Sequence, residues 1–492
     1  MTIRDAMTRG DVMAAAAAGA LPATTRAPAE GRDDELTKLS IAEASRRIAG
    51  REISPVELTR AYLERIERID KRVNAYITVT GEQALEQAHA LERELMEGRS
   101  RGPLHGIPLG LKDNIDTAGV LTTAASAVYA DRVPAKDARV VTLLRDAGAV
   151  FLGKLNMHEF ALGGTGVVTH YGPVRNPWDL NYTAGGSSSG SAAAVAARMC
   201  AAALGTDTAA SIRVPAAYCG VVGFKATYGL ASIRGIVPVS ETHDHVGPLA
   251  RSVADCALVM TALSGFDPLD PASIDVPRAD FNEAIGRDVS GLRIGIPRAP
   301  FFEDLDPEIA VATDAALALL KDMTRGLASV ELPSIDSSAV IHAETNEYHA
   351  PLVADPARRA LYKPRTIDRL LSRANVSSAD YIQSRRRLVT ARKAVGDLFA
   401  NVDVLVMPCA MRMPATVEEA LRDPPGFPFI RNTVQFNNYG IPAISVPCGF
   451  TRAGLPIGLQ ISGPPLGETR VLALAHAYEQ ATARYRREPS LG

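Results

Sequence analysis

The sequence is poor in the features that mark several common protein classes. Its 492 residues include five cysteines, which are scattered and form no C-x-x-C pair, so neither a disulfide framework nor a zinc knuckle is expected. The 53 basic and 55 acidic side chains nearly balance and form no long run of one sign, which argues against a nucleic-acid partner. No uncharged apolar stretch of about 18 residues occurs, so no membrane-spanning helix is predicted.

The first 34 residues differ from the rest of the chain. They are rich in alanine, carry Arg4, Arg9 and Arg26, and contain one short apolar run at 12–21. A secretory leader has a basic start, an apolar middle and a small-residue cleavage site. Residues 1–34 are therefore interpreted as a disordered tail of a cytoplasmic protein, with a degenerate twin-arginine export leader as the alternative.

Residues 35–492 are predicted to form one α/β domain. Capping-box patterns at Ser40 and Ser54 precede helical apolar patterns, so the domain is expected to open with helices. Beyond Gly106, short apolar runs alternate with helical stretches, which predicts a large mixed β-sheet covered by helices on both faces. Strand-like runs continue after the Pro- and Asp-rich stretch 267–280, so one sheet is expected to span both sides of it. The expected strands are 107–111, 149–152, 221–224, 292–297 and 402–408. The expected helices after the opening ones are 83–96, 138–146, 192–203, 307–320 and 381–399.

Glycine, serine and threonine are concentrated in two clusters, at 184–191 and 205–215. Small residues let the backbone approach a ligand closely and leave N–H groups accessible, which suits an oxyanion hole. A nucleophilic serine also needs a base. None of the nine histidines lies in a recognisable serine-hydrolase arrangement. On composition alone, a loop at the start of a helix is the better interpretation of each cluster.

A candidate base lies upstream of both clusters. Lys112 ends the strand-like run 106–112. Burial removes the hydration of an ammonium group and lowers the pKa of lysine from about 10.4 by as much as several units. A neutral lysine can then accept a proton. Taken alone, Lys112 would fit a surface lysine better than a base.

Together, these segments resemble the amidase signature family. The family pattern has a lysine in a G-x-P-x-x-x-K-D run, a G-G-S-S-x-G block and a G-T-D-x-x-x-S-I-R-x-P-A block. These correspond here to residues 106–113, 185–190 and 205–216. The serines of the two blocks, Ser187 and Ser211, are separated as in the family. Further matching runs lie at 175–179, 219–225, 245–248, 440–447 and 456–460, so the resemblance covers about residues 36–479.

The resemblance implies a serine amidohydrolase that needs no metal and no cofactor. Ser211 would be the nucleophile, Ser187 the bridging serine after a cis peptide bond, and Lys112 the base. Backbone N–H groups of residues 208–211 would hold the oxyanion. The family commonly has Gly-Gly before the nucleophile, whereas this chain has Ala209 and Ala210, which add two methyl groups beside the predicted oxyanion hole.

Four neighbouring residues are expected to support the site. They are Ser188 and Ser189, through hydrogen bonds within their loop, and Asp207 and Arg213, as an ion pair. Thr208 is expected to contribute a backbone N–H to the oxyanion hole. Substrate selection is assigned to residues outside the signature. These are the N-terminal helices, residues 157–166, with Met157, Gly163 and Gly164 as candidates, and the stretch around residues 348–381.

The expected substrates are small acyl or aryl amides. Carbamates and esters are also considered, because the same relay would act on their carbonyl groups. With one tryptophan and 5% aromatic residues, no aromatic cage is indicated. A homodimer is typical of the family.

Two alternative enzymes stay open. Residues 186–190 satisfy G-x-S-x-G, which would make Ser188 the nucleophile of an α/β-hydrolase esterase, although the preceding run is a poor strand. The same catalytic blocks would also serve a glutamine-hydrolysing amidotransferase subunit. Such subunits hold the charged ends of the substrate with an acid and an arginine in the C-terminal third. Residues 432–439 contain Asn437 and Asn438 in place of an acidic residue, so they give no clear match to such a subunit.

Overall fold

The computed structural model describes residues 29–422 and 427–491. Residues 1–28, where most of the predicted tail or export leader falls, lie outside the described residues. Helix α1 (Ala29–Lys38) begins within the stretch predicted as a tail, so regular structure starts before residue 35. None of the described helices is both long and apolar enough to cross a membrane.

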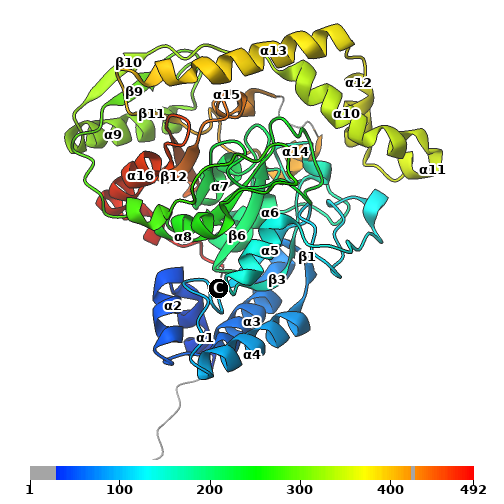
Figure 1. The fold of residues 1–492 in the computed structure, drawn as a ribbon, viewed down its shortest axis with the longest axis vertical. Helices are drawn as coiled ribbons and strands as arrows, with labels where there is room; N and C mark the ends of the chain where they lie inside the picture. The colour runs from blue at the N-terminus through cyan, green and yellow to red at the C-terminus, as the bar shows by residue number, and fades with distance from the viewer. Residues whose placement is uncertain (1–28, 423–426, 492) are drawn as a thin grey trace, which may run out of the picture.

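The described chain opens with helices, as the capping patterns predicted. After α1 come α2 (Ile41–Ala49), α3 (Pro55–Val73) and α4 (Gly81–Met96). The Ser40 side chain accepts a hydrogen bond from the Glu43 backbone N–H at the start of α2. Ser54 and Glu57 complete a reciprocal capping box at the start of α3. These helices lie at the bottom of Figure 1, where α3 and α4 pack against each other and against the sheet.

One mixed sheet of eleven strands runs through the described chain. In spatial order its strands are β1 (Tyr76–Val79), β3 (Val150–Leu155), β2 (Pro108–Lys112), β6 (Ala202–Asp207), β8 (His245–Ala250), β7 (Val222–Lys225), β12 (Ala443–Phe450), β13 (Pro456–Ser462), β11 (Val404–Pro408), β9 (Ile294–Pro297) and β10 (Leu327–Val330). Strands from both sides of 267–280 belong to this sheet, which confirms the predicted single sheet. A separate pair is formed by β4 (Arg175–Asn176) and β5 (Asp179–Thr183).

Helices cover both faces of the sheet, as predicted. Those packed on it include α5 (Arg139–Asp146), α6 (Ser189–Ala196), α7 (Arg213–Cys219), α8 (Val253–Leu263), α9 (Pro307–Met323) and α16 (Glu468–Thr482). The helix α6 consists of small residues and is buried along its whole length. A Cβ atom at Gly190 would come within 2.4 Å of the Ala75 carbonyl oxygen, so glycine is needed for this close packing.

The structure corrects one predicted helix. The alanine-rich run 192–203 was expected to be a single helix, but α6 ends at Ala196 and β6 begins at Ala202. Arg198, with φ of +58°, lies in the left-handed region between them and ends the helical path. A run of alanines carries no apolar periodicity, so the sequence could not place this change.

Six further α-helices of the described chain lie between α9 and α16. They are α10 (Ser338–Ala354), α11 (Pro356–Arg359), α12 (Pro364–Ser372), α13 (Ser378–Ala394), α14 (Val417–Arg422) and α15 (Val434–Asn438). The predicted helix 381–399 corresponds to α13 followed by a short 3₁₀ turn at Val395–Phe399. In Figure 1, α10 to α13 run across the top and upper right of the molecule.

Candidate active site

The site forms where two neighbouring strands end. β2 and β6 run parallel and are hydrogen-bonded to each other, with Leu111 opposite Leu204. Their carboxyl ends therefore meet at one edge of the sheet. Lys112 is the last residue of β2, and Thr206 lies next to the end of β6. Strand pairing thus brings together residues that are far apart in the sequence.

The predicted base and bridging serine are in direct contact. The Lys112 Nζ atom lies 2.7 Å from Ser187 Oγ and 2.7 Å from Thr206 Oγ1, and both side chains, Lys112 and Ser187, are 0% exposed. The Gly186–Ser187 peptide bond is cis, as the resemblance implied. The Ser187 carbonyl oxygen accepts a hydrogen bond from the His158 backbone N–H at 3.1 Å. The serine is therefore held by its backbone as well as by its hydroxyl.

The environment of Lys112 favours a neutral amine. Burial lowers its pKa to about 7, although the carboxylates of Asp207 and Asp244 act in the opposite direction. Burial also raises the pKa of Asp244 to about 6, which weakens its opposing charge in mildly acidic solution. At neutral pH a large fraction of Lys112 can therefore accept a proton.

The predicted nucleophile lies on the loop between β6 and α7. Ser211 is partly exposed and lines a cavity of about 460 Å³ together with Thr208, Ala209 and Ala210. Within the described chain, the backbone N–H groups of Ala209, Ala210 and Ser211 donate to no protein acceptor. These groups are thus left for a ligand. Neither alanine has a positive φ, so replacing the family's glycines costs no backbone strain here.

A buried ion pair supports this loop. Asp207 and Arg213 are both 0% exposed and lie 3.0 Å apart, as expected from the sequence. Burial alone would raise the pKa of Asp207, but the Arg213 guanidinium holds it well below its usual range. Asp207 also accepts a hydrogen bond from the Ile212 backbone N–H at 3.0 Å. The ion pair thereby closes the loop that carries Ser211.

Sequence reasoning missed the amides that complete this network. Asn437 Nδ2 donates to the carbonyl oxygen of Asp207 at 3.0 Å and to its carboxylate at 2.9 Å, and Asn437 Oδ1 accepts from Arg213. Gln460 Oε1 accepts from Arg213 at 2.8 Å. Asn437 thus supports the nucleophile loop, a role unrelated to the substrate-binding acid that was sought at this point of the sequence. Asn437 lies just before the family-matching run 440–447, and Gln460 ends the run 456–460. This position was the sequence feature that could have indicated them.

The two serines after Ser187 behave differently. The Ser188 hydroxyl donates to the Thr206 carbonyl oxygen at 3.2 Å and accepts from the Thr206 N–H at 3.3 Å. Ser189 starts α6, and its buried hydroxyl has no hydrogen-bond partner among the described residues, so the hydrogen-bonding role expected of it is not observed. Ser188 is 0% exposed and does not line the cavity. The geometry therefore offers no support for an esterase with Ser188 as its nucleophile.

The three candidate substrate-binding residues are dispersed. Gly163 lines the cavity. Met157 is fully buried and is not among the lining residues. Gly164 is not among them either, and a Cβ atom there would come within 2.2 Å of the Phe429 ring. Of the three, Gly163 alone is placed to contact a ligand.

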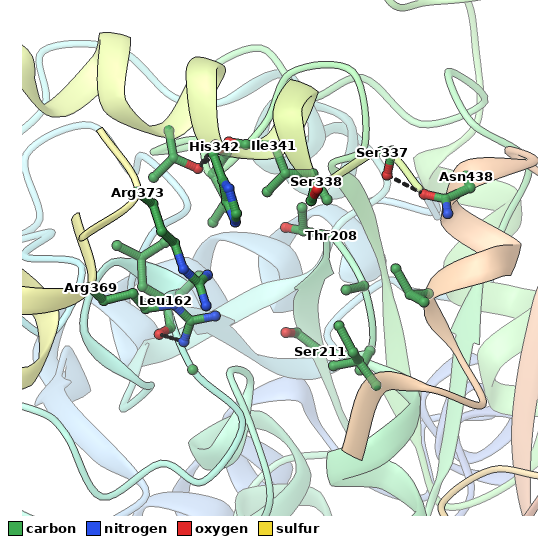
Figure 2. A pocket seen from close by; sticks show the side chains of 18 of the residues that line it. Leu162, Thr208, Ser211, Ser337, Ser338, Ile341, His342, Arg369, Arg373 and Asn438 are labelled. Atoms are coloured by element: carbon green, nitrogen blue, oxygen red, sulfur yellow. Dashed lines mark hydrogen bonds between the residues drawn. The ribbon is translucent and has the colours of Figure 1, made fainter. Parts of the chain in front are cut away.

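The wall opposite Ser211 includes part of the stretch 348–381, which was expected to select the substrate, although no charged residue of it was singled out. Figure 2 shows Arg369 of α12, Arg373 directly after α12 and His342 of α10 pointing into the cavity that Ser211 borders. Burial lowers the pKa of Arg369 to about 9, so its guanidinium stays charged at neutral pH. Burial and the two guanidinium charges lower the pKa of His342 to about 4, so its ring is neutral. The exposed residue Asp336 also lines this cavity.

The described residues contain no cluster of three or more histidine, cysteine, aspartate or glutamate side chains arranged to hold a metal ion. The five cysteines are all buried and free.

Comparison with known proteins identifies the family. A family model described as Amidase matches residues 57–472, which include the lysine and both serine clusters. The chain belongs to the amidase signature family. It is therefore an enzyme that hydrolyses amide C–N bonds. The resemblance inferred from the three motifs is confirmed.

The relatives of this amidase include proteins with different names. A glutamyl-tRNA(Gln) amidotransferase subunit from Geobacter sp. (strain M21) is 39% identical, with 91% of this chain and 98% of that protein covered. The peptide amidase from Stenotrophomonas maltophilia matches with a TM-score of 0.81 and 33% identity, covering 92% of this chain and 99% of that one. The corresponding amidotransferase subunit from Thermotoga maritima matches with a TM-score of 0.74 and 31% identity, covering 91% and 94%.

The first prediction concerns the pH dependence of this amidase. Its kcat/KM for an uncharged amide should fall about tenfold per pH unit below pH 7, because Lys112 then takes up the proton that it must accept from Ser187. A pH profile from 5 to 9 tests this. Activity that stays constant down to pH 5 would contradict a neutral Lys112 as the base.

The second prediction concerns stability. Asp207→Asn should lower the free energy of unfolding by about 3–5 kcal/mol, because it leaves the charge of Arg213 buried without its partner. Asp403→Asn is the matched control, since its partner Arg293 has a side chain that is 40% exposed and a much smaller loss is expected. Denaturant titration measures both values. Equal losses for the two variants would show that the buried pair contributes no more to the free energy of unfolding than the exposed one.

Proposed function

We propose that this amidase hydrolyses small carboxamides that carry a carboxylate group, through an acyl-enzyme on Ser211. The observation that carries the acyl-enzyme chemistry is the 2.7 Å contact between Lys112 Nζ and Ser187 Oγ, fully buried beside the cavity that Ser211 lines. A serine hydroxyl is a poor nucleophile without a base, and Lys112 is placed to act through Ser187.

The chemistry follows from these positions. Neutral Lys112 takes the proton of Ser187, which takes the proton of Ser211 as its oxygen attacks the amide carbonyl. The backbone N–H groups of Ala209, Ala210 and Ser211 are available for the oxyanion, and one such donor is worth about 3–4 kcal/mol in comparable enzymes. Ser187 then returns a proton to the leaving nitrogen. Water, activated by the same relay, releases the acid.

The cavity wall supports an anionic substrate. Arg369 and Arg373 place two guanidinium groups in the same cavity as Ser211, and guanidinium is well matched to carboxylate. The aryl and alkyl amides expected from the sequence offer no anion for this wall. Asp336 at the same cavity could pair with an ammonium group. An amino acid with a side-chain amide, such as glutamine, combines these features.

A second candidate function is that of a glutamine-hydrolysing amidotransferase subunit. It is favoured by the 39% identity, over nearly the whole length of both chains, to relatives named as glutamyl-tRNA(Gln) amidotransferase subunits. In that case the ammonia released at Ser211 would be passed to a partner protein. A homodimer and a cytoplasmic location remain predictions from the sequence.

The third prediction concerns substrate preference. Glutamine and succinamate should be hydrolysed with a higher kcat/KM than uncharged amides of similar length, and Ser211→Ala should abolish both activities. Arg373→Gln should raise KM for the carboxylate-bearing amides roughly 10–100-fold, because one charged hydrogen bond is lost, and leave the uncharged amides unaffected. Release of ammonia measures all rates.

The control for this variant is Arg386→Gln on α13, which removes an exposed arginine outside the cavity. Preference for uncharged or aryl amides would contradict the carboxylate assignment while leaving the relay intact. Undiminished activity of Ser211→Ala would contradict the relay itself.

The fourth prediction separates the two candidate functions. If the chain works within an amidotransferase, affinity-tagged protein expressed in its native cells should retain stoichiometric partner chains through size-exclusion chromatography. Its glutaminase activity should then rise in the complex. Full activity of a chain that purifies without partners would exclude the amidotransferase role and leave the free-standing amidase.

A further inference from the structure

Thr206 contacts the amine of Lys112 through two of its oxygen atoms. Its side-chain Oγ1 lies 2.7 Å from Lys112 Nζ, and its carbonyl oxygen lies 3.4 Å from the same atom. With Ser187 Oγ at 2.7 Å, the lysine therefore has three oxygen neighbours. A protonated lysine has three N–H donors. Two of its three acceptors belong to Thr206.

The oxygen atoms of Thr206 are themselves held in place. Asn114 Nδ2 donates to Thr206 Oγ1 at 3.2 Å, and the same amide donates to the Val237 carbonyl oxygen at 3.3 Å. The Ser188 hydroxyl bonds to both the N–H and the carbonyl oxygen of Thr206. Strand pairing of Thr206 with Val246 fixes its backbone from the other side. The oxygen atoms of Thr206 are therefore fixed before the lysine becomes charged, as a preorganised site requires.

We propose that Thr206 is a positioning residue that sets the basicity of Lys112, by accepting two N–H groups of the ammonium formed when Lys112 takes the proton of Ser187. This inference rests on the proposed relay. In that step the Ser187 O–H bond breaks and an N–H bond forms on Lys112, while Ser187 receives the proton of Ser211. The reverse transfer follows when the proton reaches the leaving nitrogen, so the lysine ends unchanged.

The charged groups around Lys112 do not provide these contacts. Asp207 follows Thr206 on β6 and is bound to Arg213, and Asp244, which precedes β8, accepts from Thr208 Oγ1 at 2.5 Å. Both carboxylates favour the ammonium through charge, and among the described residues neither is hydrogen-bonded to Nζ. Burial lowers the pKa of His158 to about 3, so this neighbour is uncharged. Direct acceptance of the N–H groups is left to Thr206 and Ser187.

The test compares Thr206→Val with Thr206→Ser. Valine keeps the shape but removes the hydroxyl acceptor, so the ammonium loses one hydrogen bond. Loss of a hydrogen bond to a charged group corresponds to a shift of about one pH unit. The acidic limb of kcat/KM should therefore move about one unit to lower pH. The plateau should fall roughly tenfold, because the base is weaker. Serine restores the acceptor and should restore both values.

The shift of the acidic limb and the fall of the plateau distinguish a positioning role from a structural one. A merely structural role would lower the plateau and leave the limb in place, which would overturn the proposal, as would an unchanged profile. Thr142→Val on α5 is the matched control, since its hydroxyl bonds only the carbonyl oxygen of Ala138 in its own helix. Its profile should match that of the parent.

Thermal unfolding checks that Thr206→Val is folded, and labelling of Ser211 by a fluorophosphonate checks that its site is assembled. If the valine variant does not fold, Asn114→Ala takes its place, because it frees the Thr206 hydroxyl to rotate away and should shift the limb in the same direction. The proposed relay fails separately: Lys112→Ala at the parent rate would refute it whatever the Thr206 variants do.

Discussion

The burial of one amine determines how this site is built. Lys112 is 0% exposed, and removal of water from its ammonium group brings its pKa to about 7. A lysine on the surface would be fully protonated at neutral pH and could not accept a proton. The surrounding structure must therefore exclude water from Lys112 and still offer oxygen atoms to the charged form. The neighbouring oxygens of Ser187 and Thr206 meet the second requirement, and the tightly packed strand ends meet the first.

The sheet makes this arrangement possible because it gathers distant residues at one edge. Parallel pairing of β2 and β6 places Lys112 beside Thr206, and the loop after β6 carries Ser211. The small residues of α6 let that helix lie close to the strands, so that Ser187, two residues before its start, reaches Lys112. The buried pair of Asp207 and Arg213 then holds the loop that carries Ser211 in place. Catalytic geometry and core packing depend on the same contacts.

The sequence could single out Lys112, Ser187 and Ser211, which the structure brings to this edge, because each lies in a contiguous motif. The Gly/Ser clusters and Lys112 could be recognised together, and β2, β3 and β7 followed from short apolar runs. The charged residues of the cavity wall could not be found in this way, although the stretch 348–381 was expected to select the substrate. His342 lies on α10, Arg369 on α12 and Arg373 directly after α12, and nothing in their local sequence distinguishes them from the other arginines and histidines of the chain. The alanine-rich run 192–203 was misread for the related reason that it has no periodicity.

This division has a consequence for how specificity can change. One side of the cavity is the loop of residues 208–211, which is tied through Asp207 to the buried network. The other side includes residues 334–346 and 369–373, which make no hydrogen bond to Lys112, Ser187 or Ser211 among the described residues. Substitutions there can alter the charge and shape of the cavity wall, and thereby the substrate that it accepts, without changing the contacts of Lys112 and Ser187. Relatives named as a peptide amidase and as amidotransferase subunits can thus share one catalytic edge. In this chain, Arg369 and Arg373 give the variable side two guanidinium groups, on which the proposed preference for carboxylate-bearing amides rests.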